Sequence, residues 1–206
     1  MNRRAMKKHL FSALLLTLSL TLAGCDAAST GPSPTGKPPL EGARIGGPFT
    51  LQDKAGQTVR WSDFDGQYRV VYFGYAYCPD VCPLDMQTLM KGFAQFAKAH
   101  PKLADQVQPI FITVDPARDT PKVVGEFTGA FSDRLLGLTG TAKAVDQAAK
   151  AFGVYYAKGK VSPGGGYLMD HTRGTYLMGR QGEPIALVPV DAGPDAVAAE
   201  LAKWIR

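Results

Sequence analysis

Residues 70–86, VVYFGYAYCPDVCPLDM, lead from an apolar run through two cysteines into a helix-like pattern. The first part of this stretch is apolar and aromatic, which predicts a buried strand over 70–77 of the kind found inside a parallel sheet. Proline then interrupts the pattern, and apolar residues recur after it at helical spacing. This spacing predicts an amphipathic helix that begins near Cys82 and ends before Pro101. Cys78 and Cys82 therefore lie at a strand-to-helix turn.

The position of the two cysteines has chemical consequences. The free amides and the positive end of the dipole at a helix N-terminus favour a thiolate over a thiol. With Cys82 in the first turn and Cys78 just before it, both sulfurs can converge on one point, and soft thiolates select Cu(I) or Zn(II) over hard cations. A structural disulfide or a pair of buried thiols fits the same spacing. The cysteines alone therefore leave a metal site, a redox pair and a structural role open.

The first residues predict export from the cytoplasm. Four basic residues stand among the first eight, and the apolar run at 10–22 is shorter than the roughly 20 residues of a transmembrane helix. The run ends in Leu-Ala-Gly-Cys at 22–25, which resembles the bacterial lipoprotein cleavage box. We therefore expect residues 1–24 to be a lipoprotein signal peptide and Cys25 to carry lipid; the alternative is an ordinary signal peptide with a coincidental cysteine. Asp26 resembles the signal that retains lipoproteins in the inner membrane of many Gram-negative bacteria.

The charge balance argues against one class of partner. The chain of 206 residues has a formal net charge of +5, and removal of residues 1–24 with their four basic residues lowers it to +1. A nucleic-acid-binding domain usually carries an excess of basic residues, so we expect no nucleic-acid partner. With Cys25 lipidated, two cysteines remain for chemistry. In an extracytoplasmic space such a pair tends to oxidise to a disulfide bond.

The chain divides into an anchor, a tether and one domain. Residues 25–43 contain the lipidated cysteine and a run rich in Pro, Gly, Ser and Thr that has little to bury. Its roughly 14 residues reach about 40 Å when extended at about 3.1 Å each, which is enough to hold a domain clear of a membrane. Residues 44–206 fit a single domain with enough apolar content for a core.

Within this domain, strands and helices alternate between two hairpins. This order predicts an α/β fold with a mixed central sheet that is covered on both faces by helices and preceded by an N-terminal β-hairpin. Glycine turns, capping threonines and helix-opening prolines mark the boundaries. Besides the central strand and helix, the expected elements are hairpins over 49–61 and 172–190, a strand over 107–114, a short strand or turn over 135–138, and helices over 121–131, 141–152 and 194–205.

Three motifs in this order resemble one family. Two cysteines at a strand-to-helix turn of such a sheet look like the thioredoxin fold, but thioredoxin carries CxxC rather than CxxxC. The longer spacing in FGYAYCPDVCP at 73–83, together with TVDPARDTP at 113–121 and YLMDHT at 167–172, resembles the Sco/SenC family of copper-binding assembly factors for cytochrome c oxidase. The resemblance spans the domain after the tether and implies a thioredoxin-like fold.

The resemblance also implies a set of metal ligands. Cys78 and Cys82 match the family's two thiolate ligands, and His171 matches its histidine ligand. Only one other histidine follows the signal peptide; this is His100, which lies at a polar helix end where a solvated side chain is expected. Two thiolates suit Cu(I), and an added imidazole helps to accommodate Cu(II), although Cys and His also suit zinc.

Access to such a site is expected to depend on a loop. His171 is expected to begin the second hairpin, and the segment SPGGG at 162–166 precedes it. We expect this segment to be mobile and to let His171 approach or leave a metal. Tyr75 and Tyr77 are expected to pack and to shield the site.

Polar residues near the motifs have smaller expected roles. Asp80 and Asp85 are close to the cysteines and are candidates for an outer contact to the metal or a transient ligand, or for residues that cap or solvate the helix start. Asp115, Arg118 and Asp119 belong to the TVDPARDTP motif, where they either dock a partner or brace the loop beside the site.

The leading functional prediction is a copper metallochaperone rather than an enzyme. It would be lipid-anchored on the periplasmic or extracytoplasmic face of a bacterial cell membrane, the inner membrane in a Gram-negative organism. Its cargo, Cu(I) or Cu(II), would come from a periplasmic donor and go to the CuA centre of cytochrome c oxidase subunit II or to another cuproprotein. The alternative is a thiol-disulfide reductase that keeps a partner's cysteines reduced and depends on a separate thiol reductant. A peroxide-detoxifying enzyme of the same fold is a third reading.

Overall fold

The computed structural model describes residues 36–206, so the predicted signal peptide, Cys25 and most of the predicted tether lie outside the described residues. Within 36–206 no helix is long and apolar enough to cross a membrane. In chain order the elements are β1 (Thr50–Gln52), β2 (Thr58–Arg60), η1 (Trp61–Phe64), β3 (Tyr68–Gly74), α1 (Val81–Ala99), α2 (Pro101–Ala104), β4 (Val107–Thr113), α3 (Pro121–Gly129), β5 (Leu136–Leu138), α4 (Ala142–Ala151), β6 (Tyr156–Lys158), β7 (Met169–His171), β8 (Thr175–Met178), β9 (Pro184–Leu187), η2 (Val190–Ala192) and α5 (Pro194–Trp204).

Five strands form the central sheet in the order β5-β4-β3-β8-β9. The middle strand, β3, runs parallel to β4 with Tyr72 opposite Phe111, and antiparallel to β8 with Tyr72 opposite Thr175. All of its residues are buried, as expected for an apolar strand with a neighbour on each side. The predicted mixed sheet is confirmed, but β3 ends at Gly74 rather than at residue 77.

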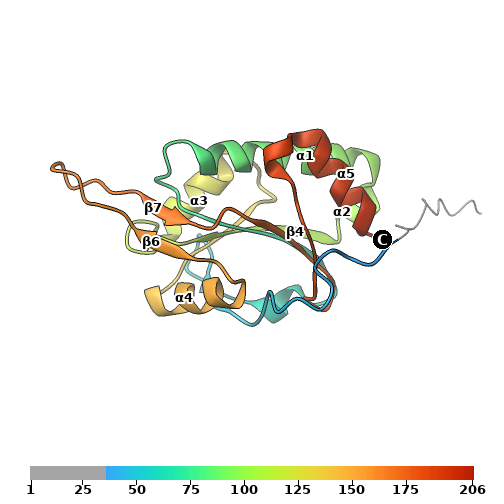
Figure 1. The fold of residues 1–206 in the computed structure, drawn as a ribbon, viewed down its shortest axis with the longest axis horizontal. Coiled ribbons are helices and arrows are strands. Elements are labelled where there is room, and N and C mark those ends of the chain that lie inside the picture. Colours follow the sequence, from blue (N-terminus) through green and yellow to red (C-terminus); the bar gives the residue numbers. More distant parts are fainter. Residues whose placement is uncertain (1–35) are drawn as a thin grey trace, which may run out of the picture. The chain divides into compact units, whose positions relative to one another are not determined.

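Different helices cover the two faces of this sheet (Figure 1). Tyr72 and Phe73 are consecutive in β3, so their side chains point to opposite faces. The Tyr72 hydroxyl donates to the carboxylate of Asp85 in α1 at 2.9 Å, and α1 packs on α5 across Gly92. On the other face the Phe73 ring packs on Phe152 at the end of α4, with centroids 5.3 Å apart. The α1 boundaries agree with the prediction, because the helix begins at the residue before Cys82.

Predicted capping residues begin two of the shorter helices. Thr120 accepts a hydrogen bond from the backbone N–H of Val123 at the start of α3, and Thr141 accepts one from Ala144 at the start of α4. These side chains satisfy amides that have no partner within the helix. The predicted starts of α3 and α4 are therefore confirmed.

The N-terminal hairpin is also confirmed. Strands β1 and β2 pair antiparallel, with Leu51 opposite Val59. The turn between them is held by the Asp53 carboxylate, which accepts hydrogen bonds from the backbone N–H groups of Ala55 and Gln57, each at 2.9 Å.

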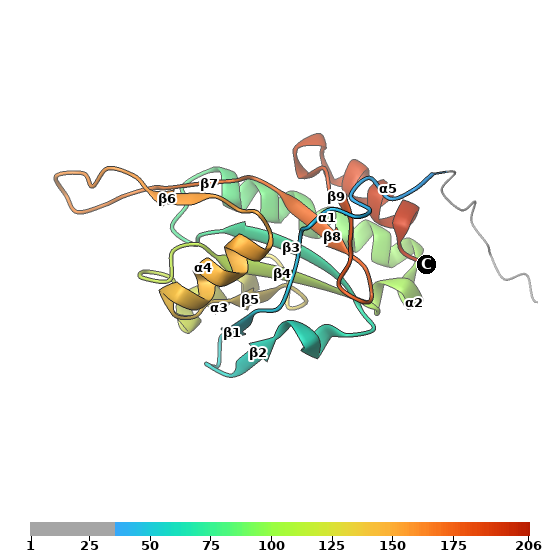
Figure 2. The same ribbon diagram turned by 60° about the horizontal axis from the view of Figure 1, so that its bottom comes forward.

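Sequence analysis did not predict the two-stranded arm, residues 156–171, which projects beyond the central sheet in both ribbon views (Figures 1 and 2). In the arm β6 and β7 pair antiparallel, with Tyr156 opposite His171. His171 therefore ends β7, and the expectation that it begins the second hairpin is wrong, since β8 starts at Thr175. The segment 162–166 forms the arm's tip, where the Ser162 N–H donates to the Gly166 carbonyl at 2.8 Å. Its expected mobility stays a prediction.

Candidate metal centre

The two cysteines lie in the cysteine segment, residues 74–82, which joins β3 to α1. The Cys78 N–H donates to the Tyr75 carbonyl at 3.2 Å, closing a turn directly after the strand. The Cys82 N–H then points at the Cys78 sulfur, with a nitrogen-to-sulfur distance of 3.3 Å. Because both contacts involve backbone groups of the same short segment, the Cys78 sulfur is held close to the N-terminus of α1, as the spacing predicts.

Gly74 makes room for the second sulfur. Cys82 is completely buried, and a Cβ atom on Gly74 would lie 3.1 Å from its sulfur and 2.7 Å from the Tyr72 ring. Real Cβ atoms rarely approach other atoms so closely, so any larger residue at the end of β3 would displace the thiol or the ring. Glycine at this position therefore lets the Cys82 thiol lie against the end of β3.

The two thiols have different acidities. Burial opposes ionisation of Cys78, but the backbone N–H groups of Cys82 and Asp80 outweigh it, so the pKa of Cys78 is lower than that of an ordinary thiol. Burial dominates at Cys82 and raises the pKa of its thiol to about 12. The expectation that the helix N-terminus favours a thiolate is therefore correct for Cys78 and wrong for Cys82, because desolvation of a completely buried thiol exceeds the effect of the helix amides.

The imidazole of His171 lies against the buried thiol. Its Nε2 atom is 3.5 Å from Cys82 Sγ, although the two residues are 89 positions apart. Its Nδ1 atom is 3.1 Å from the Thr172 carbonyl, which can only accept a hydrogen bond, so this contact fits the neutral tautomer that carries its proton on Nδ1 and turns the Nε2 lone pair toward the sulfur. The rings of Tyr72 and Tyr75 flank the imidazole edge-on, with centroids 6.4 and 6.0 Å away.

The separation between thiol and imidazole fits two ligands of one ion. An ion held about 2.3 Å from a sulfur and about 2.0 Å from an imidazole nitrogen at a tetrahedral angle places those atoms roughly 3.5 Å apart. Cys82 Sγ and His171 Nε2 have this separation. Across residues 36–206, however, no three Cys, His, Asp or Glu side chains are gathered closely enough to hold an ion as they stand. Binding through Cys78 as well therefore requires a side chain to move.

A groove of about 380 Å³ opens over these side chains. Residues 78–81 line one side of it, and residues 168–171 of the arm line the other. Tyr75 is buried beneath the groove, whereas Tyr77 is 53% exposed. Tyr75 therefore packs as expected. Tyr77 follows the end of β3 and is largely exposed, and its ring contacts the Arg118 guanidinium, whose carbon lies 5.1 Å from the ring centroid.

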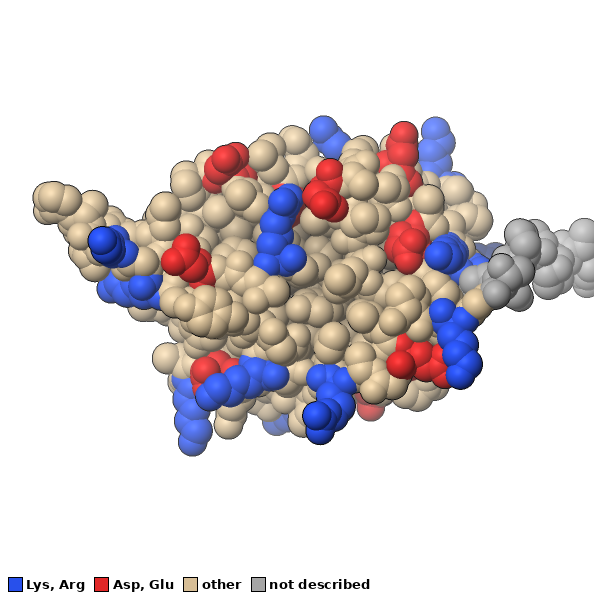
Figure 3. Space-filling view, in the orientation of Figure 1, with Lys and Arg blue, Asp and Glu red and all other residues tan. Residues whose placement is uncertain are grey.

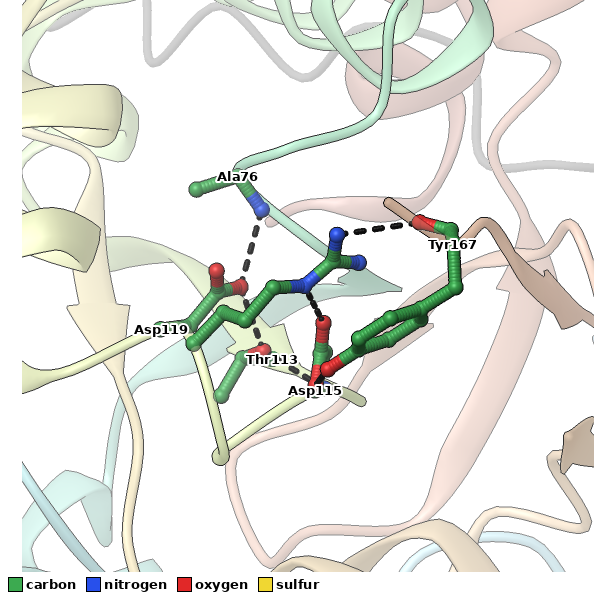
Figure 4. A network of polar contacts seen from close by, with 6 residues as sticks. Ala76, Thr113, Asp115, Asp119 and Tyr167 are labelled. Carbon is green, nitrogen blue, oxygen red and sulfur yellow. Dashed lines mark hydrogen bonds and ion pairs between the residues drawn. The ribbon is translucent and has the colours of Figure 1, made fainter. Parts of the chain in front are cut away.

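The TVDPARDTP motif joins the arm to the domain (Figure 4). Arg118 donates from Nε to the Asp115 carboxylate at 2.5 Å and from Nη1 to the Tyr167 carbonyl at 2.9 Å. The Tyr167 hydroxyl donates to the same carboxylate at 2.9 Å, and the guanidinium carbon lies 3.6 Å from the centroid of the Tyr167 ring. The arm is therefore fastened by side chains from the loop after β4.

Asp119 braces the start of the cysteine segment. Its buried carboxylate accepts hydrogen bonds from the Ala76 N–H at 2.8 Å and the Thr113 hydroxyl at 2.6 Å (Figure 4). Burial raises the pKa of this carboxyl, and the two donors oppose the rise only in part. Asp115, Arg118 and Asp119 thus contact the loops beside the cysteines, as the bracing interpretation expects. Asp80 is exposed and makes no side-chain cap, although it is the residue before α1.

His100 is exposed at the end of α1, as expected. Met86, Met90, Met169 and Met178 are buried in the hydrophobic core, and Met169 also lines the groove beside His171.

Asp85, an expected candidate for an outer contact to the metal, instead forms an ion pair that the sequence did not predict. Asp85 is buried on α1, and Arg173, in the link between β7 and β8, donates to both of its carboxylate oxygens. No spacing in the sequence signals a contact between residues 88 positions apart. Only the position of Arg173 two residues after His171 could have drawn attention to it.

The charges on the surface give no sign of a nucleic-acid site on the face drawn in Figure 3. Lys and Arg are interspersed there with Asp and Glu, and no single-sign stripe is present on that face. This distribution agrees with the nearly neutral charge that remains after the predicted signal peptide is removed.

Known proteins are similar to this chain over most of its length. The SCO1/SenC family model matches residues 37–206. Protein SenC of Rhodobacter capsulatus is 44% identical over 160 residues, which cover 76% of this chain and 68% of SenC. The human mitochondrial Protein SCO1 homolog is 36% identical over 162 residues, which cover 79% of this chain and 53% of the human protein. The chain therefore spans only about half of the human relative's length.

Solved structures share the fold. The structure of Bradyrhizobium japonicum ScoI with copper bound is 35% identical with a TM-score of 0.70, and the match covers 78% of this chain and 99% of that one. BsSco, a member of the Sco family of cytochrome c oxidase assembly proteins in which a disulfide switch was identified, is 26% identical with a TM-score of 0.60, and the match covers 81% and 95%. The predicted thioredoxin-like α/β fold is thereby confirmed, and the chain belongs to the SCO1/SenC family.

Proposed function

We propose that this protein is a copper metallochaperone that binds its cargo through Cys78, Cys82 and His171. The observation that carries the proposal is the 3.5 Å separation between Cys82 Sγ and His171 Nε2, which suits two ligands of one soft ion. Membership of a family that includes a ScoI solved with copper bound supports copper over zinc.

The unequal thiols suggest an order of capture. Cys78 has the lowered pKa and lies at the open groove, so its thiolate meets incoming copper first. Cys82 then loses its proton to become the second ligand, since coordination to a metal deprotonates a thiol outright. In the tautomer that the Thr172 carbonyl favours, with the ring proton on Nδ1, His171 offers Nε2 to the metal without losing a proton. Copper leaves by exchange of these ligands for those of the recipient.

We further propose the location and the recipient. The predicted lipid on Cys25 anchors the protein to the extracytoplasmic face of a bacterial membrane, and the Pro-rich segment holds the domain away from the lipid surface. BsSco belongs to a family of cytochrome c oxidase assembly proteins, so we propose the CuA centre of oxidase subunit II as the destination. A periplasmic donor would supply the copper, and a thiol reductant would keep Cys78 and Cys82 reduced.

Metal analysis and X-ray absorption of the reduced, intact protein test this proposal. We expect one copper per chain with two sulfur ligands and one imidazole. His171→Ala should remove the imidazole signal and weaken Cu(II) binding, whereas the matched variant His100→Ala should change neither. Absence of stable copper binding, or an imidazole signal that survives in His171→Ala, would overturn the proposed site.

A second function, thiol-disulfide reduction, is favoured by the difference in pKa and burial between the Cys78 and Cys82 thiols. The Cys78 thiolate would attack a disulfide of the partner and release one partner thiolate, forming a mixed disulfide. The Cys82 thiolate would then attack the Cys78 sulfur and release the second partner thiol. The partner gains two electrons and two protons, and this protein is left with a Cys78–Cys82 disulfide that the external reductant must reduce.

The same histidine separates the two functions. His171→Ala should impair copper delivery and oxidase assembly if metal transfer dominates, whereas reduction of a disulfide substrate should be largely unchanged. Oxidase assembly measured in cells that express His171→Ala or His100→Ala therefore decides between them. Full assembly with His171→Ala would favour the reductase.

A further inference from the structure

An ion pair lies one helical turn behind the contact between Cys82 and His171. Arg173 Nε donates to Asp85 Oδ2 at 2.7 Å, and Arg173 Nη2 donates to Asp85 Oδ1. Two parallel hydrogen bonds between a guanidinium and a carboxylate fix the orientation of the groups as well as their distance. The proposed copper site uses neither residue as a ligand.

The ion pair connects the same two segments as the candidate ligands. Asp85 follows Cys82 by three positions on α1, so both lie on one side of the helix. Arg173 follows His171 by two positions, in the link between β7 and β8. The two contacts join residues 88 and 89 positions apart, respectively. A displacement of the link along α1 would therefore change both distances together.

The Asp85 carboxylate is buried in the core and held there by hydrogen bonds. Asp85 is 1% exposed, and its Oδ2 atom also accepts the hydrogen bond from the Tyr72 hydroxyl in the middle strand. A buried carboxylate is costly unless charged or polar partners satisfy its oxygens. Arg173 supplies that partner from a half-exposed side chain, 47% accessible. The exposed link is therefore joined to a buried carboxylate that is also hydrogen-bonded to the middle strand.

Strand pairing holds β7 and the start of the link to β6, with Tyr156 opposite His171 and two hydrogen bonds between Tyr155 and Thr172, but it does not connect the link to α1. The arm strands β6 and β7 form a two-stranded sheet that is separate from the central one, and β8 joins the central sheet only from Thr175 onward. The edge-on rings of Tyr72 and Tyr75 limit how the imidazole tilts. They do not set how far His171 extends toward the sulfur along the direction of β7.

We propose that Asp85 and Arg173 are positioning residues that set the distance between Cys82 Sγ and His171 Nε2. The proposal rests on the proposed copper site and adds the element that makes its third ligand available. Neither residue touches the cargo. Arg173 acts through the link it shares with His171, and Asp85 acts through the helix turn it shares with Cys82.

One test needs no metal. In the reduced, metal-free, intact protein, the ring signals of His171 are followed by NMR in the parent, in Arg173→Ala and in a control, Arg134→Ala. Arg134 also pairs with a carboxylate, that of Asp105, and its side chain is similarly exposed at 43%. We expect the His171 signals to shift and broaden in Arg173→Ala and to stay unchanged in the control. Unchanged His171 signals in a folded Arg173→Ala protein would overturn the proposal.

A second test uses copper and a double-mutant cycle. Loss of a residue that orients a metal ligand typically weakens metal binding about 10- to 100-fold, so we expect that loss of Cu(II) affinity in Arg173→Ala, with an altered electron paramagnetic resonance spectrum. In the His171→Ala background the same substitution should change affinity less than about twofold, because a residue that acts through the histidine has nothing left to position. An equal loss in both backgrounds would show a general structural effect and overturn the proposal.

Two further controls keep the outcomes separate. If Arg173→Ala does not fold, Arg173→Lys retains a cation beside the buried carboxylate but loses the two parallel hydrogen bonds, and the same shifts should appear in smaller size. If the parent protein binds no copper, the copper-site proposal fails. The NMR comparison still decides whether Asp85 and Arg173 position His171.

Discussion

The cysteine segment and the arm supply their candidate ligands in opposite ways. The cysteine segment continues the middle strand into α1, and its own backbone amide holds the Cys78 sulfur at 3.3 Å, while the Cys82 thiol is completely buried. The arm forms a separate two-stranded sheet, and side-chain contacts from Arg118 and Arg173 fasten it. The Cys82 sulfur is therefore part of the core and the Cys78 sulfur borders the core at the groove, whereas the imidazole is placed by side-chain contacts at the rim of the core.

This difference suits a carrier better than a permanent metal site. The Cys82 thiol is already buried beside the imidazole before copper arrives, and Cys78 joins it by a side-chain movement on a segment held by its own backbone, so little ordering cost accompanies capture. A ligand on a side-chain-fastened hairpin can withdraw at a smaller cost, because only local contacts break. The proposed release of cargo therefore begins with His171. The predictions that follow test how sharply the two regions differ.

The largest expected effect comes from removing a core ligand. Since loss of an outer positioning residue costs about 10- to 100-fold in metal affinity, loss of a ligand itself should cost more, on the order of 1000-fold. We therefore expect Cys82→Ser to lose tight Cu(I) binding, and His171→Ala to keep most of it. Competition with a Cu(I) chelator measures both. Equal losses in the two variants would abolish the distinction between core and rim ligands.

The second prediction concerns the two thiols within the cysteine segment. The pKa of Cys78 is below that of an ordinary thiol, and the pKa of Cys82 is raised to about 12. Because the thiolate is the nucleophile, raising the pH through the lowered value ionises Cys78 first. A higher-pKa thiolate is intrinsically more reactive, which offsets part of this advantage, so we expect iodoacetamide at pH 8 to label Cys78 at least about 30-fold faster. Mass spectrometry of the reduced protein measures both rates. Comparable rates would show that the Cys82 thiol is not enclosed.

Sequence patterns were sufficient to predict the strand and the helix on either side of the cysteine segment. The apolar run before Cys78, the prolines and the helical spacing after Cys82 reflect local physics, because strand, turn and helix are encoded by neighbouring residues. The strand end was misplaced because Tyr75 and Tyr77 have strand propensity, whereas the turn closed by the Tyr75 carbonyl decides the boundary. Tertiary context overrides propensity at such positions.

The arm and the link that follows it could not be predicted from sequence patterns in the same way. Strands β6 and β7 contain three residues each, which is too short for alternation to be recognised. The pairing of Asp85 with Arg173 joins distant segments and leaves no periodic trace. His171 itself was found only because YLMDHT resembles a family motif, and the residues that hold it in place were identified from the structure.

The third prediction tests how closely α1, the helix that carries Cys82, packs against α5. A Cβ atom on Gly92 would lie 2.5 Å from Val197 Cβ and 2.6 Å from the Pro194 carbonyl oxygen of α5. Gly92→Ala should therefore lower the free energy of unfolding by about 1–3 kcal/mol through overpacking. Gly129→Ala is the matched control, because nothing lies within 4 Å of the added methyl group, and it should be neutral or slightly stabilising. Urea denaturation measures both, and equal values would show that the two helices are not closely packed.

The smallest effect is expected at the arm. Arg118 lies 3.6 Å from the Tyr167 ring centroid and donates to the Tyr167 carbonyl, so Arg118→Met should lower the free energy of local opening by about 1–2 kcal/mol. Amides of the arm, such as that of Gly159, which donates to the Leu168 carbonyl at 2.8 Å, should then exchange roughly 5- to 30-fold faster. Amides of β3 should keep their rates, and Arg134→Met should change neither set. Faster exchange in β3 as well would mean that the arm and the core open as one unit, and the imidazole would then be no easier to withdraw than the sulfurs.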